Sequence, residues 1–281
     1  MRIDMLKKLR CLYCHGTTFM LKNKGYEMEI KSGTIICKSC GHQYEIREGI
    51  PKFLRDKKVS IDPRVRVFHE HYDRYDSWFR SKKGKVLFES EVKAIKLLLG
   101  ESFFQESLEV GVGTGEFASK LSIRYGIDPA WSALKIAKSR GIEVIQGVAE
   151  DLPFKNNIFD AIFLIVTICY VQDPRKVLEE ANRVLKQNGK LVIGYIDRES
   201  SWGQLYLLKK REGHLFYSPA RFYTFKEIEK MLNKTGFKII GTASTLKQKP
   251  TEDPYSEEPE IGLRKDASFI VIMSRKLSDV K

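Results

Sequence analysis

From about residue 103 onward, the chain alternates short apolar runs with stretches of helical periodicity. The runs rich in β-branched residues predict strands near 104–110, 123–127, 142–146, 158–165, 190–196, 237–245 and 267–274. Apolar positions at helical spacing predict helices near 115–121, 130–140, 174–187 and 224–235. Strands separated by helices in this way indicate βαβ units, a parallel sheet and therefore an α/β fold.

The end of the chain departs from this alternation. No helical pattern separates the last two predicted strands, which are joined by the acidic, turn-rich stretch KPTEDPYSEEPEIGLRKD. Neighbouring strands without a crossover connection pair antiparallel. We therefore expect these two strands to form an antiparallel hairpin at one edge of the sheet.

Two amphipathic helices precede the sheet. The apolar residues of the first recur at helical spacing and are Val67, Phe68, Tyr72, Tyr75 and Phe79. The second helix lies within VLFESEVKAIKLLLG, and a charge-rich linker precedes both. The expected organisation is a small N-terminal module over 1–55, the linker and these helices as a lid over 56–100, and the main domain over 101–281.

Four of the five cysteines form two Cys-x2-Cys pairs separated by 22 residues, Cys11/Cys14 and Cys37/Cys40. The segment between the pairs alternates polar and apolar residues around Gly25 and Gly33, as short strands do. Two such turns on short strands predict a zinc ribbon with a closed, structural four-cysteine site. A module of this size has little core, so zinc would supply much of its folding free energy.

This N-terminal stretch resembles a known zinc-ribbon family over roughly residues 6–55. The likeness is carried by SGTIICKSC, from Ser32 to Cys40, and by YEIREGIPKFL, from Tyr44 to Leu54. The family is the small zinc ribbon shared by an activator subunit of RNA and protein methyltransferases and by short bacterial homologues.

The stretch EVGVGTG (109–115) raises the question of which nucleotide its glycines approach. A dinucleotide fingerprint has the spacing G-x-G-x-x-G, whereas this turn reads G-x-G-x-G. Glu109 would repel a pyrophosphate but suits a ligand that carries an amino group. Asp128, at the end of the next predicted strand, can accept both ribose hydroxyls of an adenosine. A ligand with a ribose, an adenine and an ammonium but no phosphate is S-adenosylmethionine.

Further motifs, GVAEDLPF, NNIFDAIFLIVTICYVQDP and ANRVLKQNGKLVIGYID, follow in order along the chain. The series resembles class I S-adenosylmethionine-dependent methyltransferases of the broad type that includes quinone-biosynthesis enzymes. The resemblance implies a Rossmann-like seven-stranded sheet of order 3-2-1-4-5-7-6 with strand 7 antiparallel. It also implies the cofactor contacts: Glu109, Gly111 and Gly113 at the methionine end, Asp128 at the ribose, Pro129, Ala149 and Glu150 at the adenine, and Ile165 and Val166 near the methyl group.

The methyl acceptor is not readable from the sequence. The loop VTICYVQDP, which follows the fourth strand of the domain, lacks the motifs of adenine, glutamine and pyrimidine methylating enzymes. Tyr170 is a candidate for shaping the acceptor site, and His69 or His71 is a candidate general base. Cys169 fits a small core residue better than a reactive thiol. The aromatic and basic stretch 195–224 can bind nucleic acid or form a lid helix over a small molecule.

The net charge of +13 over 281 residues leaves RNA open as a partner, although a lysine-rich solvated surface explains it equally well. No apolar run is long enough to span a membrane, and the N-terminus carries no apolar signal core, so we expect a cytoplasmic protein. Three functions stay open: a small-molecule methyltransferase, an RNA methyltransferase that docks through its zinc ribbon, and a non-catalytic cofactor-binding partner of another methyltransferase.

Overall fold

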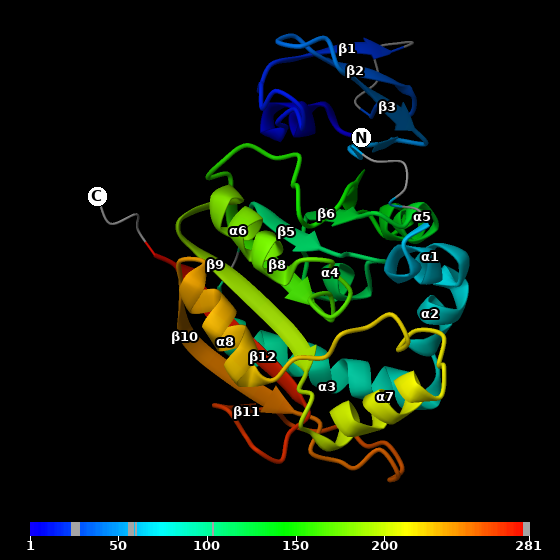
Figure 1. The fold of residues 1–281 in the computed structure, drawn as a ribbon, viewed down its shortest axis with the longest axis vertical. Helices are drawn as coiled ribbons and strands as arrows, with labels where there is room; N and C mark the ends of the chain where they lie inside the picture. The colour runs from blue at the N-terminus through cyan, green and yellow to red at the C-terminus, as the bar shows by residue number, and fades with distance from the viewer. Residues whose placement is uncertain (24–28, 56–58, 60, 103, 278–281) are drawn as a thin grey trace.

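The computed structural model describes residues 1–23, 29–55, 59, 61–102 and 104–277. Within these ranges the chain forms two sheets, a small one at the N-terminus and a large one that follows it (Figure 1). Parts of the expected linker, and the expected turn at Gly25, lie outside the described residues.

The small sheet has four antiparallel strands in the order β1-β2-β3-β4 and follows a 3-10 helix, η1. The first Cys-x2-Cys turn precedes β1 and the second joins β2 to β3, so both turns are carried by short strands as the ribbon prediction requires. The elements are η1 (Ile3–Lys8), β1 (Phe19–Asn23), β2 (Gly33–Cys37), β3 (Gln43–Arg47) and β4 (Ile50–Pro51).

The large sheet has the strand order β11-β10-β12-β9-β8-β5-β6-β7. β12 is antiparallel to both of its neighbours, and the strands from β9 to β7 are parallel. This order confirms the predicted 3-2-1-4-5-7-6 arrangement and adds the two-residue edge strand β11. The strands are β5 (Ser107–Val110), β6 (Tyr125–Asp128), β7 (Glu143–Gln146), β8 (Phe159–Ile165), β9 (Leu185–Ile196), β10 (Phe237–Thr245), β11 (Glu260–Ile261) and β12 (Phe269–Lys276).

Most of the α-helices begin where a side chain accepts a hydrogen bond from a backbone N–H of the first turn, which satisfies an otherwise unpaired donor. The capping residues are Asp62, Ser81, Asp173, Ser200 and Thr224. The helices are α1 (Pro63–Glu70), α2 (Tyr72–Trp78), α3 (Lys82–Leu99), α4 (Glu116–Lys120), α5 (Trp131–Ser139), α6 (Pro174–Val184), α7 (Ser201–Arg211) and α8 (Phe225–Lys234).

Two details differ from the predicted elements. The first amphipathic helix is divided at His71, whose φ of −122° and ψ of 31° separate α1 from α2. The helix predicted to end near residue 187 ends at Val184, and β9 starts at once. The glycine turn expected there is an irregularity inside β9, where the register with β8 shifts and Asn188 has a φ of 61°.

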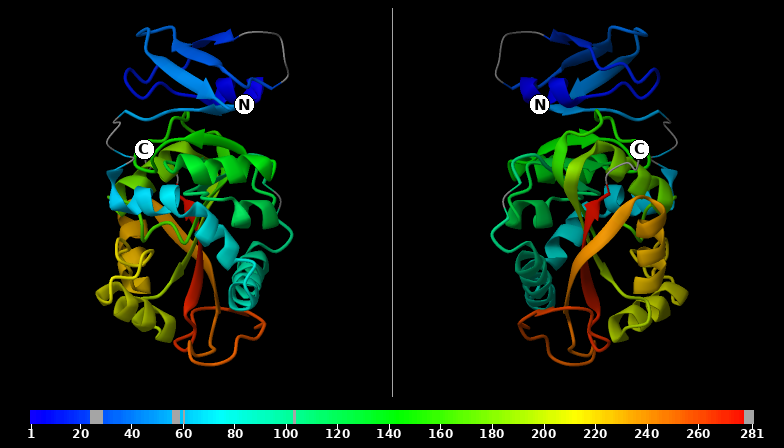
Figure 2. Two further views of the ribbon diagram at one scale, coloured as in Figure 1. Left: turned by 90° about the vertical axis from the view of Figure 1, so that its right-hand side faces the viewer. Right: turned by 90° about the vertical axis from the view of Figure 1, so that its left-hand side faces the viewer.

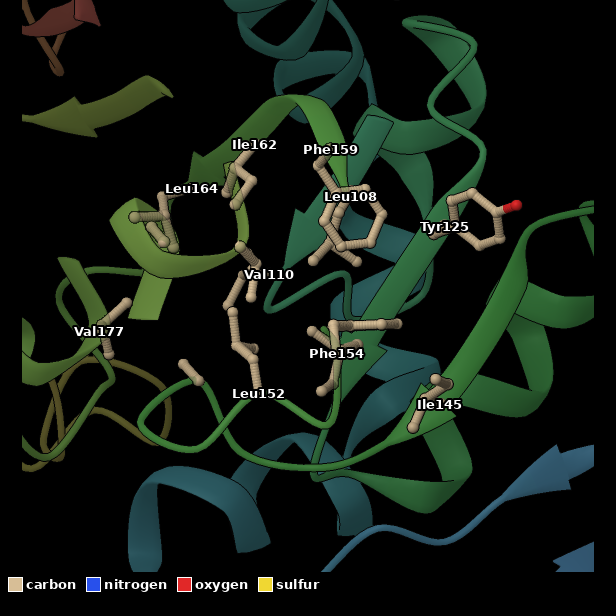
Figure 3. Packing of buried hydrophobic residues seen from close by; sticks show 14 of the residues in the cluster. Leu108, Val110, Tyr125, Ile145, Leu152, Phe154, Phe159, Ile162, Leu164 and Val177 are labelled. Carbon is tan, nitrogen blue, oxygen red and sulfur yellow. The ribbon is translucent and has the colours of Figure 1, made fainter. Parts of the chain in front are cut away.

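The two faces of the large sheet carry two apolar clusters, because side chains of a strand alternate between its faces. In β8, Ile162 and Leu164 join the cluster with α6 and α8, whereas Phe163 and Ile165 join the one with α3, α4 and α5. Figure 3 shows part of the first cluster around β5 and β8.

The zinc-ribbon module contributes to the first of these clusters. Met5, Leu9, Tyr44 and Phe53 are buried together with core residues of the large sheet. Figure 2 shows the module at one end of the molecule, with the stretch between β10 and β12 at the other. The ribbon and the large domain therefore share apolar packing.

Backbone contacts also join the ribbon to the large sheet. The N–H of Phe53, just after β4, donates to the carbonyl of Gln146 in β7 at 2.7 Å, and Lys52 forms a parallel bridge with the same residue. Leu9 forms an antiparallel bridge with Phe154. The ribbon thus adds strand-like pairing at the β7 edge, which would otherwise expose unpaired backbone groups.

Candidate cofactor and acceptor site

The glycine turn after β5 depends on backbone conformations that favour glycine. Gly111, Gly113 and Gly115 have φ values of 76°, 53° and 82°. A Cβ atom on Gly111 would lie within 3.0 Å of three side-chain atoms of Thr167, whereas one on Gly113 would find only a Tyr75 ring atom, at 3.8 Å. Gly111 is therefore needed for packing, and Gly113 leaves its side of the turn open to a ligand.

Two buried carboxylates lie at the carboxyl ends of β5 and β6. Glu109 is 2% exposed, and its Oε2 has no hydrogen-bond partner among the described residues. Burial, and to a smaller extent the charge of Asp128, raises the pKa of Glu109 well above its usual value. A buried carboxylate with one oxygen left unpaired fits a ligand that brings an ammonium group.

Asp128 is 9% exposed and is held by two backbone groups. The N–H of Gly113 donates to its Oδ2 at 2.9 Å, and the N–H of Ala130 donates to its Oδ1 at 2.8 Å. Burial raises the pKa of Asp128 to about 6. The carboxylate is thus fixed in orientation at the mouth of the glycine turn and keeps acceptor capacity for ribose hydroxyls.

A cavity of about 250 Å³ opens beside these groups. Every residue that the sequence assigned to the cofactor lines it, except Glu109, which lies in β5 at the base of the turn. The assigned residues that line it are Gly111, Gly113, Asp128, Pro129, Ala149, Glu150, Ile165 and Val166. Cavity, glycine turn and the orphaned carboxylate together fit S-adenosylmethionine.

Glu150 is less free than the sequence suggested. Its Oε1 accepts hydrogen bonds from the backbone N–H groups of Gln172 and Asp173, at 2.7 and 3.3 Å. Glu150 therefore ties the loop after β7 to the loop after β8.

Residues of α1 and α2, the segment predicted to form a lid, line one side of the cavity. Phe68 and Tyr75 line it, and their rings meet edge to face with centroids 5.1 Å apart. Phe68 also contacts Tyr170 and Phe216, with centroids 4.8 and 5.7 Å away. We call these four side chains the aromatic roof; Phe68, Tyr75 and Tyr170 line the cavity, and Phe216 packs against Phe68 and Tyr75.

The two candidate histidines do not line this cavity. His69 Nδ1 lies 3.2 Å from the hydroxyl of Ser132 at the start of α5, and His71 lies at the junction of α1 and α2. Tyr170 does line it, and its hydroxyl donates to the carbonyl of Phe216 at 3.2 Å. Of the three catalytic candidates, only Tyr170 is placed at the site.

A second, smaller hollow of about 30 Å³ adjoins the cavity, with Val166 and Tyr170 lining both. We call it the tyrosine chamber. Its remaining lining residues are Ile168, Cys169, Tyr195, Ile196, Tyr206, Tyr217, Phe222 and Tyr223. Val166, which the family resemblance assigns to the methyl end of the cofactor, is therefore a wall residue of both spaces.

Cys169 belongs to the wall of this chamber. Burial raises its pKa to about 12, and its thiol donates to the carbonyl of Val166 at 3.4 Å. A neutral, buried thiol is a poor nucleophile, which supports its interpretation as a packing residue.

The four cysteine sulfurs of the ribbon lie within 4.8 Å of one another. Cys11 and Cys40 Sγ are 3.7 Å apart, and Cys14 and Cys37 Sγ are 3.5 Å apart. A tetrahedral zinc with bonds of about 2.3 Å separates its sulfur ligands by about 3.8 Å. The cluster therefore fits a structural zinc ion.

Comparisons with known proteins agree with this site. The family model of a methyltransferase domain matches residues 108–193, from β5 into β9. The "uncharacterized protein Rv2003c" of Mycobacterium tuberculosis is 40% identical over 199 residues, which make up 70% of each chain. A solved structure from Thermotoga maritima is 36% identical to this chain, with a TM-score of 0.70. It is described as a S-adenosylmethionine-dependent methyltransferase, possible histamine N-methyltransferase. It covers 76% of this chain and 99% of its own.

The chain therefore belongs to the S-adenosylmethionine-dependent methyltransferases. A further structure with this fold comes from the complex of the Haloferax volcanii Trm112 methyltransferase activator with a protein described as a methyltransferase. It has 15% identity and a TM-score of 0.55, and covers 76% of this chain and 99% of its own. Among the described residues, no helix is both long and apolar enough to cross a membrane.

Thr167 lines the cofactor cavity and was not assigned from the sequence motifs. Gly147 and Val148, which belong to the motif GVAEDLPF, line the cavity beside the assigned residues. Tyr195 and Tyr223, at the two ends of the aromatic stretch 195–224, reach the tyrosine chamber from β9 and from the segment before α8. Glu91, a buried acid on α3, was also missed. Its signal is a single acid on the apolar face of an amphipathic helix.

Proposed function

We propose that this protein binds S-adenosylmethionine in the cavity beside the glycine turn and methylates a small molecule whose reacting end enters the tyrosine chamber. The observation that carries the proposal is that the two spaces are neighbours, since Val166 and Tyr170 belong to the walls of both. In this arrangement Glu109 meets the ammonium of the methionine end, Asp128 holds the ribose, and the 147–150 loop contacts the adenine.

The bound cofactor supplies an electrophilic methyl group on a sulfonium. A lone pair of the acceptor forms the new bond to this carbon, the carbon–sulfur bond breaks, and its electron pair stays on sulfur. The protein's own contribution is to align the acceptor and exclude water, which the aromatic roof of Phe68, Tyr75, Tyr170 and Phe216 supports.

The enclosure of the transfer point favours a small acceptor. A chamber of about 30 Å³ under an aromatic roof admits the end of a small molecule, whereas a polymer needs an open path for its backbone. The Thermotoga relative, described as a possible histamine N-methyltransferase, points to the same class of acceptor.

RNA remains the second candidate acceptor. The observation in its favour is the net charge of +13, together with the basic run Lys209, Lys210 and Arg211 in the last turn of α7. The third function is a cofactor-binding partner without activity of its own. It predicts that the protein binds the cofactor but transfers its methyl group neither to a small molecule nor to RNA.

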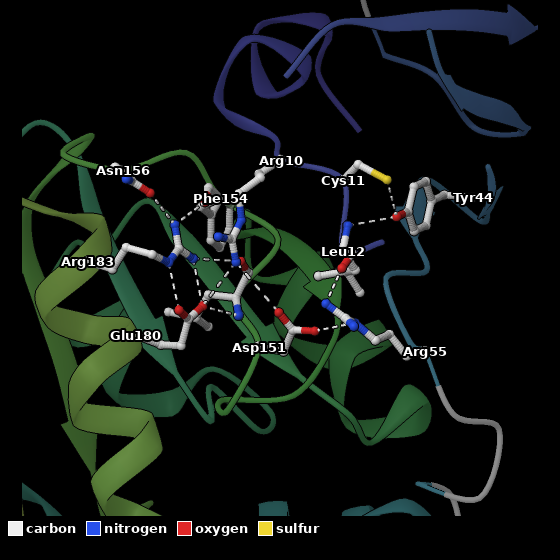
Figure 4. Close-up of polar contacts among 11 residues, drawn as sticks. Arg10, Cys11, Leu12, Tyr44, Arg55, Asp151, Phe154, Asn156, Glu180 and Arg183 are labelled. Atoms are coloured by element: carbon white, nitrogen blue, oxygen red, sulfur yellow. Dashed lines mark hydrogen bonds and ion pairs between the residues drawn. The ribbon is translucent and has the colours of Figure 1, made fainter. Parts of the chain in front are cut away.

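The zinc ribbon would act as a built-in support for the cofactor site. Arg10 pairs with Asp151 and Glu180 at 3.6 Å, and Arg55 pairs with Asp151 at 2.7 Å (Figure 4). Asp151 directly follows the 147–150 loop. The Haloferax complex joins a separate activator to a protein of this fold; here the ribbon that resembles the activator family is part of the same chain.

The acceptor class can be tested by transfer of tritiated methyl groups from S-adenosylmethionine. The substrates are a metabolite extract below about 1 kDa and total RNA from the same cells. We expect label in the small-molecule fraction only, and loss of this label in Tyr170→Ala. Label in RNA that falls steeply with salt would support the second candidate instead, and no label in either would support the non-catalytic one.

A further inference from the structure

Tyr195 carries a buried polar group that the fold does not use. It is 3% exposed and belongs to the wall of the tyrosine chamber, and its hydroxyl has no hydrogen-bond partner among the described residues. The hydroxyl of Tyr170, in contrast, is bound within the fold, since it donates to the carbonyl of Phe216. Of the five tyrosines in the chamber wall, Tyr195 is the one whose hydroxyl the described part of the chain leaves buried and unpaired.

The alternation of β9 places Tyr195 at the site. Leu191 and Ile193, two and four residues earlier, belong with it to the apolar cluster beneath α6 and α8. Ile196, the next residue, belongs to the cluster on the other face of the sheet, yet it also lines the chamber. The chamber therefore lies at the carboxyl end of β9, at the same edge of the sheet as the cofactor cavity.

Asp197, two residues further on, is not the missing partner. The backbone N–H groups of Glu199 and Phe225 donate to its two carboxylate oxygens, each at 2.8 Å. Burial, and to a smaller extent the charge of Asp197, raises the pKa of Tyr195 above its usual value. The phenol therefore keeps its proton, and it can both donate and accept a hydrogen bond.

The folded protein gains nothing from this hydroxyl. A buried hydroxyl without a partner lowers stability relative to phenylalanine, which has nearly the same shape. A ligand with a polar end would supply the missing partner when it enters the chamber. The hollow beside Tyr195 provides the space for such a ligand, and no described residue of its wall carries a charged side chain.

We infer that Tyr195 binds the methyl acceptor, and that its hydroxyl hydrogen-bonds to an oxygen or nitrogen at the acceptor's reacting end. The hydroxyl can donate to a second lone pair of an oxygen or accept from an N–H, and either bond leaves one lone pair free for the methyl carbon. Sulfur is a weak partner for a phenol, and a carbon nucleophile offers none. No proton moves to or from Tyr195, which only orients the acceptor.

The inference rests on the proposed function, since it assigns a binding residue and a class of acceptor atom to the chamber. The charges outside the wall narrow the class further. The guanidinium of Arg221 lies 5.2 Å from the ring centroid of Tyr223, and the ammonium of Lys209 lies 6.0 Å from that of Tyr217. Both disfavour a second positive charge in the chamber, so a nitrogen acceptor would react in its neutral form.

Methyl transfer by a variant that lacks only the hydroxyl tests this inference. S-adenosylmethionine with a trideuterated methyl group reacts with a low-molecular-weight metabolite extract, and mass spectrometry identifies the atom that receives the label. We expect an oxygen or nitrogen, and an initial rate at least tenfold lower in Tyr195→Phe. The affinity for S-adenosylhomocysteine should not change, and the melting temperature should not fall.

Tyr125→Phe is the matched control. The Tyr125 hydroxyl is also buried without a partner among the described residues, but Tyr125 is the first residue of β6 and lines neither space. Its variant should transfer methyl groups at the wild-type rate.

The outcomes separate this inference from the proposed function. Wild-type transfer to a small molecule with an unchanged rate in Tyr195→Phe, an equal loss in Tyr125→Phe, or a label on sulfur or carbon contradicts the inference while the proposed function stands. A lower melting temperature in Tyr195→Phe would show that the hydroxyl has a partner within the fold, which also contradicts it. If the wild type labels no small molecule, the proposed function is wrong and the inference falls with it.

Discussion

Gly111 and Gly113 occupy similar backbone conformations but differ in what surrounds them. The Cβ position of Gly111 collides with Thr167, whereas that of Gly113 is open apart from the Tyr75 ring at 3.8 Å. The open side of Gly113 is the side on which a ligand can approach the backbone. Gly111 is therefore needed for packing against Thr167, whereas Gly113 leaves the backbone open to a ligand.

An alanine at each of these positions should give different results. We expect Gly111→Ala to lower the free energy of unfolding by more than about 2 kcal/mol, since both the φ value and the contact with Thr167 are unfavourable. Gly113→Ala should lower it by about 1 kcal/mol, from the φ value alone, but should weaken cofactor binding. Urea unfolding and calorimetry check both. Equal destabilisation by the two changes would contradict the geometry.

Glu91 makes the stability of the ligand-free protein depend on pH. Its folded-state pKa of about 8 lies above the ordinary value of 4.5, so its protonated form is favoured by folding. This contribution is complete below pH 4.5 and is lost progressively as the pH rises towards 8. At pH 7 the free energy of unfolding is therefore about 3 kcal/mol lower than it would be if Glu91 stayed neutral in both states.

Glu91→Gln should therefore stabilise the ligand-free protein, by about 1 to 3 kcal/mol at pH 7, because the buried amide keeps part of the desolvation cost. The gain should shrink towards zero at pH 4.5. Urea midpoints at several pH values for this variant and for Glu89→Gln provide the measurement and its control. A gain that is independent of pH would show that Glu91 is ionised without penalty in the folded protein.

The site residues show what the sequence could and could not predict at this scale. Asp128 and the glycines were predictable because they follow strands directly, and parallel strands bring their carboxyl ends to one edge. The burial of Glu91 was not, because it depends on the packing of α3, which contacts β10 and β12 more than 100 residues further along the chain. Such contacts depend on helix packing, and no local pattern encodes them.

At the scale of elements, α2 is fastened to the glycine turn by one group of charges. Arg140, which follows α5, donates to Asp76 of α2 at 2.9 Å and to Glu116 of α4 at 2.8 Å. It also donates to the carbonyl of Thr114 in the turn, and Arg80 pairs with Asp76. The buried Asp76 therefore holds α2, the helix that carries Tyr75, in place beside the cofactor cavity.

Removing that acid should loosen the lid. We expect Asp76→Ala to weaken S-adenosylmethionine binding about tenfold, because Tyr75 loses its fixed position, and to speed amide hydrogen exchange over 63–78 more than over 107–110. Asp73→Ala, an exposed acid on the same helix, is the control. If both variants bind the cofactor as the wild type does, the charge group is not needed to hold the lid.

The elements themselves were largely predictable. The strands of the parallel sheet are short, apolar and separated by helices, and their order followed from the family resemblance. The two-residue β11 has no such pattern, since Glu260 and Ile261 are extended only because they pair with β10. The division between α1 and α2 also leaves no local signal, because the apolar spacing continues across His71.

At the scale of the whole molecule, the ribbon and the cofactor loop share contacts. The loop from Gly147 to Phe154 is held by Phe53 through Gln146, and by Arg10 and Arg55 through Asp151. The sequence predicted the ribbon but treated it as a separate module. Docking depends on two surfaces fitting each other, and neither surface is defined until both parts fold.

Loss of zinc should therefore reach the cofactor site. We expect chelation, or Cys14→Ser, to lower the melting temperature by at least about 5 °C and to weaken S-adenosylmethionine binding about tenfold. One equivalent of zinc per chain, measured by elemental analysis, should restore the chelated protein. Lys38→Ala, an exposed residue between Cys37 and Cys40, is the control. Unchanged cofactor affinity in the zinc-free protein would contradict the support role.

Calorimetric titration of S-adenosylmethionine, and separately of NADH, into wild-type protein and Asp128→Ala tests the central claim most directly. The account predicts a dissociation constant of about 1 to 100 μM for S-adenosylmethionine. It also predicts no binding of NADH, and at least tenfold weaker binding in the variant because the ribose loses a charged acceptor. Binding of NADH, absence of S-adenosylmethionine binding, or unchanged affinity in Asp128→Ala would contradict the assignment of the cavity.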